Sequence, residues 1–164
     1  MTNWQADKKW SDKFIPEIKQ ILGLHLIGEP PIEEDQQRNT DLVVLKMEAV
    51  RIGCRMRKHE YHKTYPNDIT IRAGRPSGMK TELTKIIEGW GDYFFYGFEG
   101  EDGISILAWT LGDLNVFRLW FNREIIRLKG NVPGNLKENK DKSSSFLTFQ
   151  KNNLPTDFII GEKP

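Results

Sequence analysis

The sequence has only one cysteine, Cys54, among 164 residues. A single cysteine excludes an intramolecular disulfide, so the chain is expected to fold by burying apolar surface in a reducing compartment. Cys54 occupies an apolar position of an alternating segment, which predicts a packed thiol. No apolar run approaches the roughly 18 residues of a membrane-spanning helix, and the opening stretch MTNWQADKKWSDKF lacks the apolar core of a secretion signal. We therefore expect a cytoplasmic protein with no membrane partner.

Motifs for nucleotide, zinc and nucleophile chemistry are also scarce. The stretch GRPSGMKT, residues 74–81, resembles a phosphate-binding loop but lacks its spacing. His59 and His62 lie three residues apart without a third ligand, which favours surface histidines over a zinc site. No Gly-x-Ser-x-Gly motif is present. These absences leave charge distribution as the main functional signal.

Positive charge is concentrated in one segment, although the whole chain has a net charge of only +1. Nine Lys and Arg residues stand against three acidic residues between Arg51 and Lys85, a local net charge of +6. Because attraction to nucleic acid requires a basic patch, this segment is where we expect such a ligand to bind.

Hydrophobic periodicity predicts an α/β order of elements. Helices are predicted for residues 13–27, 82–90 and 114–129, the last two beginning after the N-cap residues Thr81 and Asp113. Strands are predicted for residues 41–45, 48–58, 68–73, 92–98 and 104–111, and residues 59–68 are predicted to form a loop. We expect an α/β (α+β) fold with a single mixed β-sheet flanked by helices.

The composition changes after Gly130. Residues 131–145, NVPGNLKENKDKSSS, are typical of a flexible linker, and FLTF and DFII are interpreted as short edge strands or surface-packing segments. We therefore predict one domain over residues 1–130, followed by a linker and C-terminal tail, residues 131–164, that packs on it.

The strand predicted at residues 48–58 has an arginine face. Adjacent like charges on a strand cost stability unless anions or carboxylates lie opposite. Two explanations stay open: the face binds phosphate, or it joins an internal charge network with Asp68 or Glu48. The arginines at issue are Arg51, Arg55 and Arg57, which alternate with Val50, Ile52, Cys54 and Met56.

The element order, with Asp41 opening one strand and charged residues on the next, resembles the PD-(D/E)XK nuclease-like superfamily. The same run is similar to small uncharacterised proteins of phages and bacterial mobile elements. The resemblance covers roughly residues 10–125 and implies a restriction-endonuclease-like core. Where that superfamily has Glu-x-Lys, this chain has Gly53-Cys54-Arg55 or Arg55-Met56-Arg57. Some members move the acid or lysine onto the following helix, where TELTK supplies Glu82 and Lys85.

The resemblance implies metal-dependent phosphodiester hydrolysis in nucleic-acid processing. Asp41 and Glu82 would hold Mg²⁺ or Mn²⁺, Lys85 would stabilise developing charge, and Glu17 is a further candidate acid. DNA or RNA phosphates would be bound by the arginines, namely Arg51, Arg55, Arg57, Arg72 and Arg75.

Two alternatives need no catalysis. In the first, the same fold is an inactive nucleic-acid-binding module, and Tyr61, Tyr65 or Trp4 stacks on the bases of a single strand. In the second, the arginine face docks on an acidic protein partner. A purely structural reading also stays open, in which Glu82 caps its own helix and Lys85 pairs outward.

Overall fold

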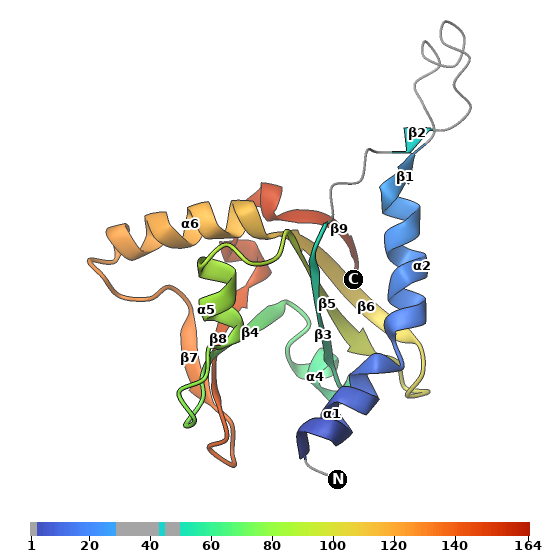
Figure 1. The fold of residues 1–164 in the computed structure, drawn as a ribbon, viewed down its shortest axis with the longest axis horizontal. Helices are drawn as coiled ribbons and strands as arrows, with labels where there is room; N and C mark the ends of the chain where they lie inside the picture. The colour runs from blue at the N-terminus through green and yellow to red at the C-terminus, as the bar shows by residue number, and fades with distance from the viewer. Residues whose placement is uncertain (1–2, 29–42, 45–49) are drawn as a thin grey trace, which may run out of the picture.

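The computed structural model describes residues 3–28, 43–44 and 50–164 (Figure 1). Two helices, α1 (Asn3–Asp12) and α2 (Ile15–Leu26), open the chain. The short strands β1 (Ile27–Gly28) and β2 (Val43–Val44) then pair with each other. The single helix predicted for residues 13–27 is therefore preceded by a second, unpredicted helix, and Asp41 lies outside the described residues.

A four-stranded mixed sheet forms the middle layer of the molecule. Its strands lie in the order β3-β5-β6-β9, with β3 parallel to β5 and the other pairs antiparallel. Their bounds are Ile52–Arg57 for β3, Tyr93–Glu99 for β5, Ile106–Asp113 for β6 and Ile159–Lys163 for β9.

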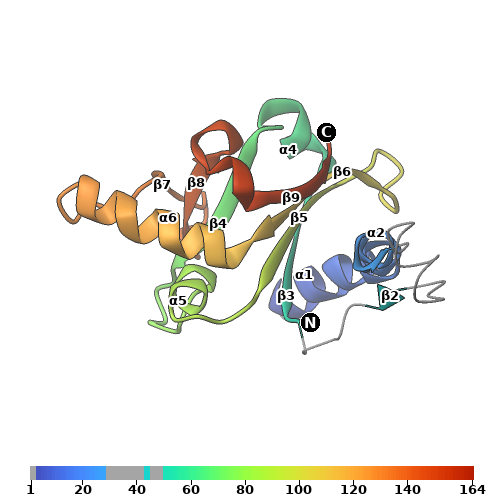
Figure 2. The same cartoon turned by 90° about the horizontal axis from the view of Figure 1, so that it is seen from above.

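A second, antiparallel sheet lies on one side of the first (Figures 1 and 2). Its order is β4-β8-β7, with bounds Asp68–Gly74, Ser145–Gln150 and Asn135–Glu138. Between the strands lie the helices α4 (His59–Thr64), α5 (Glu82–Ile87) and α6 (Leu114–Arg127), and the 3₁₀ turns η1 (Lys151–Asn153) and η2 (Thr156–Phe158).

The predicted α/β class, with a mixed sheet flanked by helices, is confirmed. The prediction of a single sheet is corrected, because β4 pairs with the distant β8 instead of joining β3 and β5. The finer expectation of a restriction-endonuclease-like core stays a prediction. Within the described ranges, no helix is both long and apolar enough to cross a bilayer.

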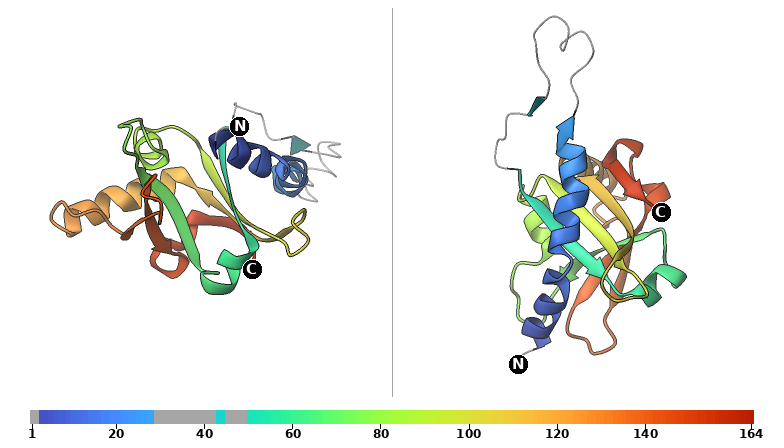
Figure 3. Two further views of the ribbon diagram at one scale, coloured as in Figure 1. Left: turned by 90° about the horizontal axis from the view of Figure 1, so that it is seen from below. Right: turned by 90° about the vertical axis from the view of Figure 1, so that its right-hand side faces the viewer.

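Helix α2 covers one face of the four-stranded sheet (Figure 3). Phe14, Ile18 and Leu22 recur at four-residue spacing and are buried against Phe95 and Trp109 of the sheet. Full burial of a side chain of this size contributes roughly 1.5–3 kcal/mol, so this stripe is enough to hold the helix in place.

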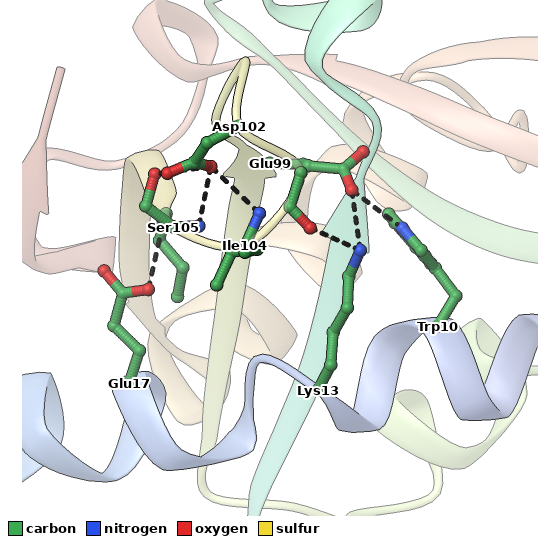
Figure 4. A network of polar contacts seen from close by, with 9 residues as sticks. Trp10, Lys13, Glu17, Glu99, Asp102, Ile104 and Ser105 are labelled. Carbon is green, nitrogen blue, oxygen red and sulfur yellow. Dashed lines mark hydrogen bonds and ion pairs between the residues drawn. The ribbon is translucent and has the colours of Figure 1, made fainter.

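Polar contacts join α1, α2 and the residues between them to the β5–β6 hairpin (Figure 4). The Glu99 carboxylate accepts hydrogen bonds from Trp10 Nε1 at 3.0 Å and from Lys13 Nζ at 2.9 Å. Glu17, on the first turn of α2, accepts the backbone amide of Ile106 at 2.9 Å. Glu17 is thus engaged on the helix-covered face of the sheet.

The opposite face packs against α5, α6 and the three-stranded sheet. Asp113 caps α6 as predicted, accepting the amides of Asn115 at 2.7 Å and Val116 at 3.3 Å. Phe117 of α6 meets Phe149 of β8 edge to face, with ring centroids 5.4 Å apart. This second core joins the two sheets.

Two predictions of irregular structure are corrected. Residues 59–68, predicted as a loop, include α4. Residues 131–145, predicted as a flexible linker, contain β7. FLTF lies in β8, at the centre of its sheet, whereas β9 is an edge strand as expected for DFII.

Candidate functional site

The arginines of β3 face the space between the two sheets. Arg55 is paired with Tyr96 and Arg57 with Phe98 in the parallel register of β3 and β5. Paired residues on adjacent strands share a face, and Tyr96 and Phe98 belong to the core that joins the sheets. Arg55 and Arg57 are consequently half-buried, whereas Cys54, predicted to be packed, is exposed.

A cavity of about 400 Å³ opens beside Arg55, and we call it the basic pocket. Strand β3 forms one wall, and β4, the loop that follows it and α5 form the others. The pocket brings together five of the nine residues predicted for metal binding, catalysis or phosphate binding. Its charged lining consists of Arg55, Arg72, Arg75, Lys80, Lys85 and a single acid, Glu82.

Glu82 connects three elements around this pocket. Its Oε2 accepts a hydrogen bond from Arg55 Nη1 of β3 at 3.0 Å and another from the backbone amide of Arg72 in β4 at 3.0 Å. Thr81, the N-cap of α5, holds Glu82 at this position by accepting the amide of Thr84 at 3.4 Å. Glu82, and not the predicted Asp68, is therefore the carboxylate that Arg55 contacts, while the other predicted partner, Glu48, lies outside the described residues.

The remaining positive charge of the basic pocket is poorly compensated. Lys80 pairs with Glu88 at 2.7 Å, but within the described ranges no carboxylate lies within 4.0 Å of the charged groups of Arg72, Arg75 or Lys85. Burial, together with Arg55 and Arg75, lowers the pKa of the Arg72 guanidinium. Glu82 and Asp7 act in the opposite direction, and the arginine stays protonated at neutral pH.

Arg55 itself has spare hydrogen-bonding capacity. Its side chain is 16% exposed, and its Nε is buried with no hydrogen-bond partner in the described part of the chain. Buried donors are nearly always paired, so a donor left over at a pocket wall is a position where a ligand oxygen is expected.

The described lining does not by itself fit a divalent cation. A Mg²⁺ or Mn²⁺ ion needs several oxygen ligands, and here one carboxylate, already engaged by two donors, faces five cationic side chains. No group of three or more His, Cys, Asp or Glu residues is found among the described residues. The predicted pairing of Asp41 with Glu82 lies outside the described residues, and Glu17 lies on the other face of the sheet.

Arg57 lines a second cavity, of about 590 Å³, which we call the aromatic pocket. Its guanidinium lies 4.0 Å from the centroid of the Tyr61 ring on α4. Lys137 and Thr148 also line this pocket. Sequence reasoning missed Lys137 because residues 131–145 were interpreted as a linker, and it missed Thr148 because FLTF was interpreted as an edge strand or a surface-packing segment.

Arg51 lines neither pocket. It precedes β3 and is exposed, and its amide donates to Asp92 Oδ2 at 2.7 Å. Its carbonyl accepts the amides of Asp92 and Tyr93. Arg51 therefore anchors the start of β5 and is separate from the clustered arginines.

No protein-family model, curated protein or solved structure matches this chain. The nuclease-like resemblance thus rests on the quoted sequence features, and function has to be inferred from the pockets.

Proposed function

We propose that the basic pocket binds phosphate groups of nucleic acid. The observation that carries this proposal is the charge of its lining, five cationic side chains around one acid that is itself engaged by Arg55. Arginine and lysine side chains bind phosphate oxygens well, and Arg72, Arg75 and Lys85 carry charge that no described carboxylate within 4.0 Å offsets, which attracts a polyanion.

Trp90 supports a nucleic-acid ligand over a free inorganic anion. Its ring is 63% exposed and lines the same pocket as the cationic groups. Proteins that bind single strands combine a positive groove with exposed aromatic rings on which bases stack. A phosphate in the pocket would place its attached nucleoside within reach of such a ring.

A second candidate is metal-dependent phosphodiester hydrolysis. It is favoured by the presence of Glu82 and Lys85 in the same pocket as the phosphate-binding arginines. Since the described lining does not complete a cation site, this candidate depends on Asp41. Its test is oligonucleotide cleavage with Mg²⁺ or Mn²⁺, comparing the wild type with Asp41→Ala and Glu82→Ala. Cleavage unaffected by either change would reject it.

Phosphate binding is tested by charge reversal in the full chain. The double variant Arg75→Glu/Lys85→Glu should weaken binding of a labelled oligonucleotide on the order of 100-fold, because both side chains line the pocket. The slope of log K against log salt should become shallower by about 0.7–0.9 per lost contact. Fluorescence anisotropy at several salt concentrations measures both.

The matched control is Lys19→Glu/Arg123→Glu, which changes net charge equally at exposed positions outside both pockets. If both double variants weaken oligonucleotide binding equally, net charge alone explains the loss, and a defined phosphate site is rejected. A stoichiometric protein partner that is captured regardless of nuclease treatment would favour the protein-docking alternative instead.

A further inference from the structure

The aromatic pocket has the size and lining of a site for a small planar group. Its volume of about 590 Å³ lies within the range of ligand sites. Tyr61 of α4 and Tyr65, which follows that helix, are 40% and 44% exposed, and each has a cation over its ring, Arg57 at 4.0 Å and Lys137 at 5.2 Å. Rings held this way offer stacking surfaces at low cost in side-chain entropy.

A hydrogen-bonding group is left unpaired in the wall of this pocket. Thr148 is 4% exposed, and its hydroxyl has no hydrogen-bond partner in the described part of the chain. Nearby in the lining, the hydroxyls of Thr70 and Tyr96 bond to each other at 3.1 Å. A buried hydroxyl without a partner is uncommon, so a ligand with its own polar edge is expected here.

The charge of the lining argues against a phosphate in this pocket. Three cationic and three acidic side chains line it, in contrast to the excess of cations in the basic pocket. An uncharged, planar group with polar edges fits such a balanced aromatic site. A nucleobase has these properties. The charged residues are Arg57, Lys137, Lys140, Asp68, Glu138 and Asp141.

The two pockets are neighbours along the same two strands. Arg55 and Arg57 are two residues apart on one face of β3, and Thr70 and Arg72 are two residues apart on β4. Two residues of strand span about 7 Å. Burial raises the pKa of the Tyr96 hydroxyl, while Arg57 and Arg55 both lower it, so Tyr96 senses one arginine from each pocket.

We propose that the aromatic pocket binds an unpaired nucleobase of the strand whose phosphate occupies the basic pocket. The preferred ligand is then single-stranded nucleic acid, since a base inside a duplex is stacked and paired and cannot enter. This inference rests on the proposed function and adds the class of substrate.

The experiment compares three probes of equal length: a single-stranded oligonucleotide, its duplex, and an abasic phosphodiester strand. Wild-type protein should bind the single strand about tenfold or more tighter than the other two. Tyr61→Ala should weaken single-strand binding toward the abasic level and leave abasic binding unchanged. Tyr61→Phe, which keeps the ring, should bind like the wild type.

Contrary binding results would reject either the base site alone or both proposals. If the abasic strand binds as tightly as the single strand, or if Tyr61→Ala leaves single-strand binding unchanged, the base site is rejected while phosphate binding stands. If none of the three probes binds, both proposals are rejected. Abasic binding that persists in Tyr61→Ala also shows that this variant is folded.

Discussion

The basic pocket and the aromatic pocket are built on the same strands, yet they differ in chemistry. Strand β3 supplies one arginine to each pocket, whereas β4 supplies Arg72 to the basic pocket and Asp68 and Thr70 to the aromatic pocket. Helix α5 and the loop before it add Lys80, Glu82 and Lys85 to the basic pocket. Helix α4 and the β7–β8 hairpin add tyrosines and mixed charges to the aromatic pocket. The strands thus set the spacing, and the flanking elements set the type of ligand.

The two pocket arginines of β3, Arg55 and Arg57, also differ in the groups that their guanidinium ions contact. The Arg55 guanidinium pairs with a carboxylate, which offsets its charge, whereas the Arg57 guanidinium lies on the Tyr61 ring, which leaves its charge unneutralised. Substituting these partners should therefore affect the two pockets differently.

The largest effect is expected from Glu82→Gln, which removes the carboxylate charge but keeps an acceptor for Arg55 and the Arg72 amide. Oligonucleotide affinity should rise by about tenfold, or about 1.4 kcal/mol, because Arg55 loses its neutralising partner. The free energy of unfolding should fall by about 1.5–3 kcal/mol, the range for hydrogen bonds to charged groups. Anisotropy and urea denaturation measure these changes.

Glu88→Gln is the control for stability, since Glu88 pairs with Lys80 at the surface and should contribute less than about 1 kcal/mol to the free energy of unfolding. If affinity in the presence of Mg²⁺ instead falls in Glu82→Gln, the carboxylate acts as a metal ligand, and the hydrolytic candidate is favoured.

The local part of this architecture was predictable from sequence, and the non-local part was not. Alternation located β3 and β4, and the caps Thr81 and Asp113 located the starts of α5 and α6. These signals act over a few residues. The short helix α4 was missed because its N-cap residue, Lys58, makes no side-chain capping bond.

Some residues of the candidate site were likewise identified from the sequence, and others were revealed only by the fold. Charge counting identified Arg55, Arg72 and Lys85, which the fold brings into one pocket. It could not identify Glu82 as the partner of Arg55, because that contact depends on where α5 packs against the sheets. It also missed Thr148, because β8 joins β4 through pairing between distant parts of the chain.

A smaller effect is expected from a matched pair of Thr→Val changes in the aromatic pocket. Thr148→Val removes an unpartnered hydroxyl and should raise the free energy of unfolding by about 0.5–1 kcal/mol in the absence of ligand. Thr70→Val removes the partner of the Tyr96 hydroxyl and should lower it by about 1 kcal/mol. Urea denaturation distinguishes the two, and equal signs would show that the Thr148 hydroxyl has a partner in solution.

The smallest effect is a pH dependence beside the aromatic pocket. Burial, with His59 and Lys151, lowers the pKa of His62, whose ring meets Phe98 at 5.0 Å. The pKa of His62 in the folded state lies below the unfolded value of about 6.5, so this difference does not affect stability above that pH. As the pH falls from about 6.5 through the folded pKa, protonation favours the unfolded state and the free energy of unfolding decreases. The thermal midpoint should decline less over this window in His62→Asn than in the wild type, and equal declines would contradict this assignment.

Strand pairing in this molecule also constrains the order in which it folds. Asp68 pairs with Gln150, Ile52 with Tyr93 and Leu111 with Gly161, so each sheet joins segments that are distant along the chain. The entropy of closing such long loops is lost before the strand contacts form. Folds with many non-local contacts therefore fold slowly, in roughly milliseconds to seconds. Both pockets use β4 as a wall. During refolding or synthesis, the proposed binding of a nucleic-acid strand should accordingly become possible late, when β8 docks on β4.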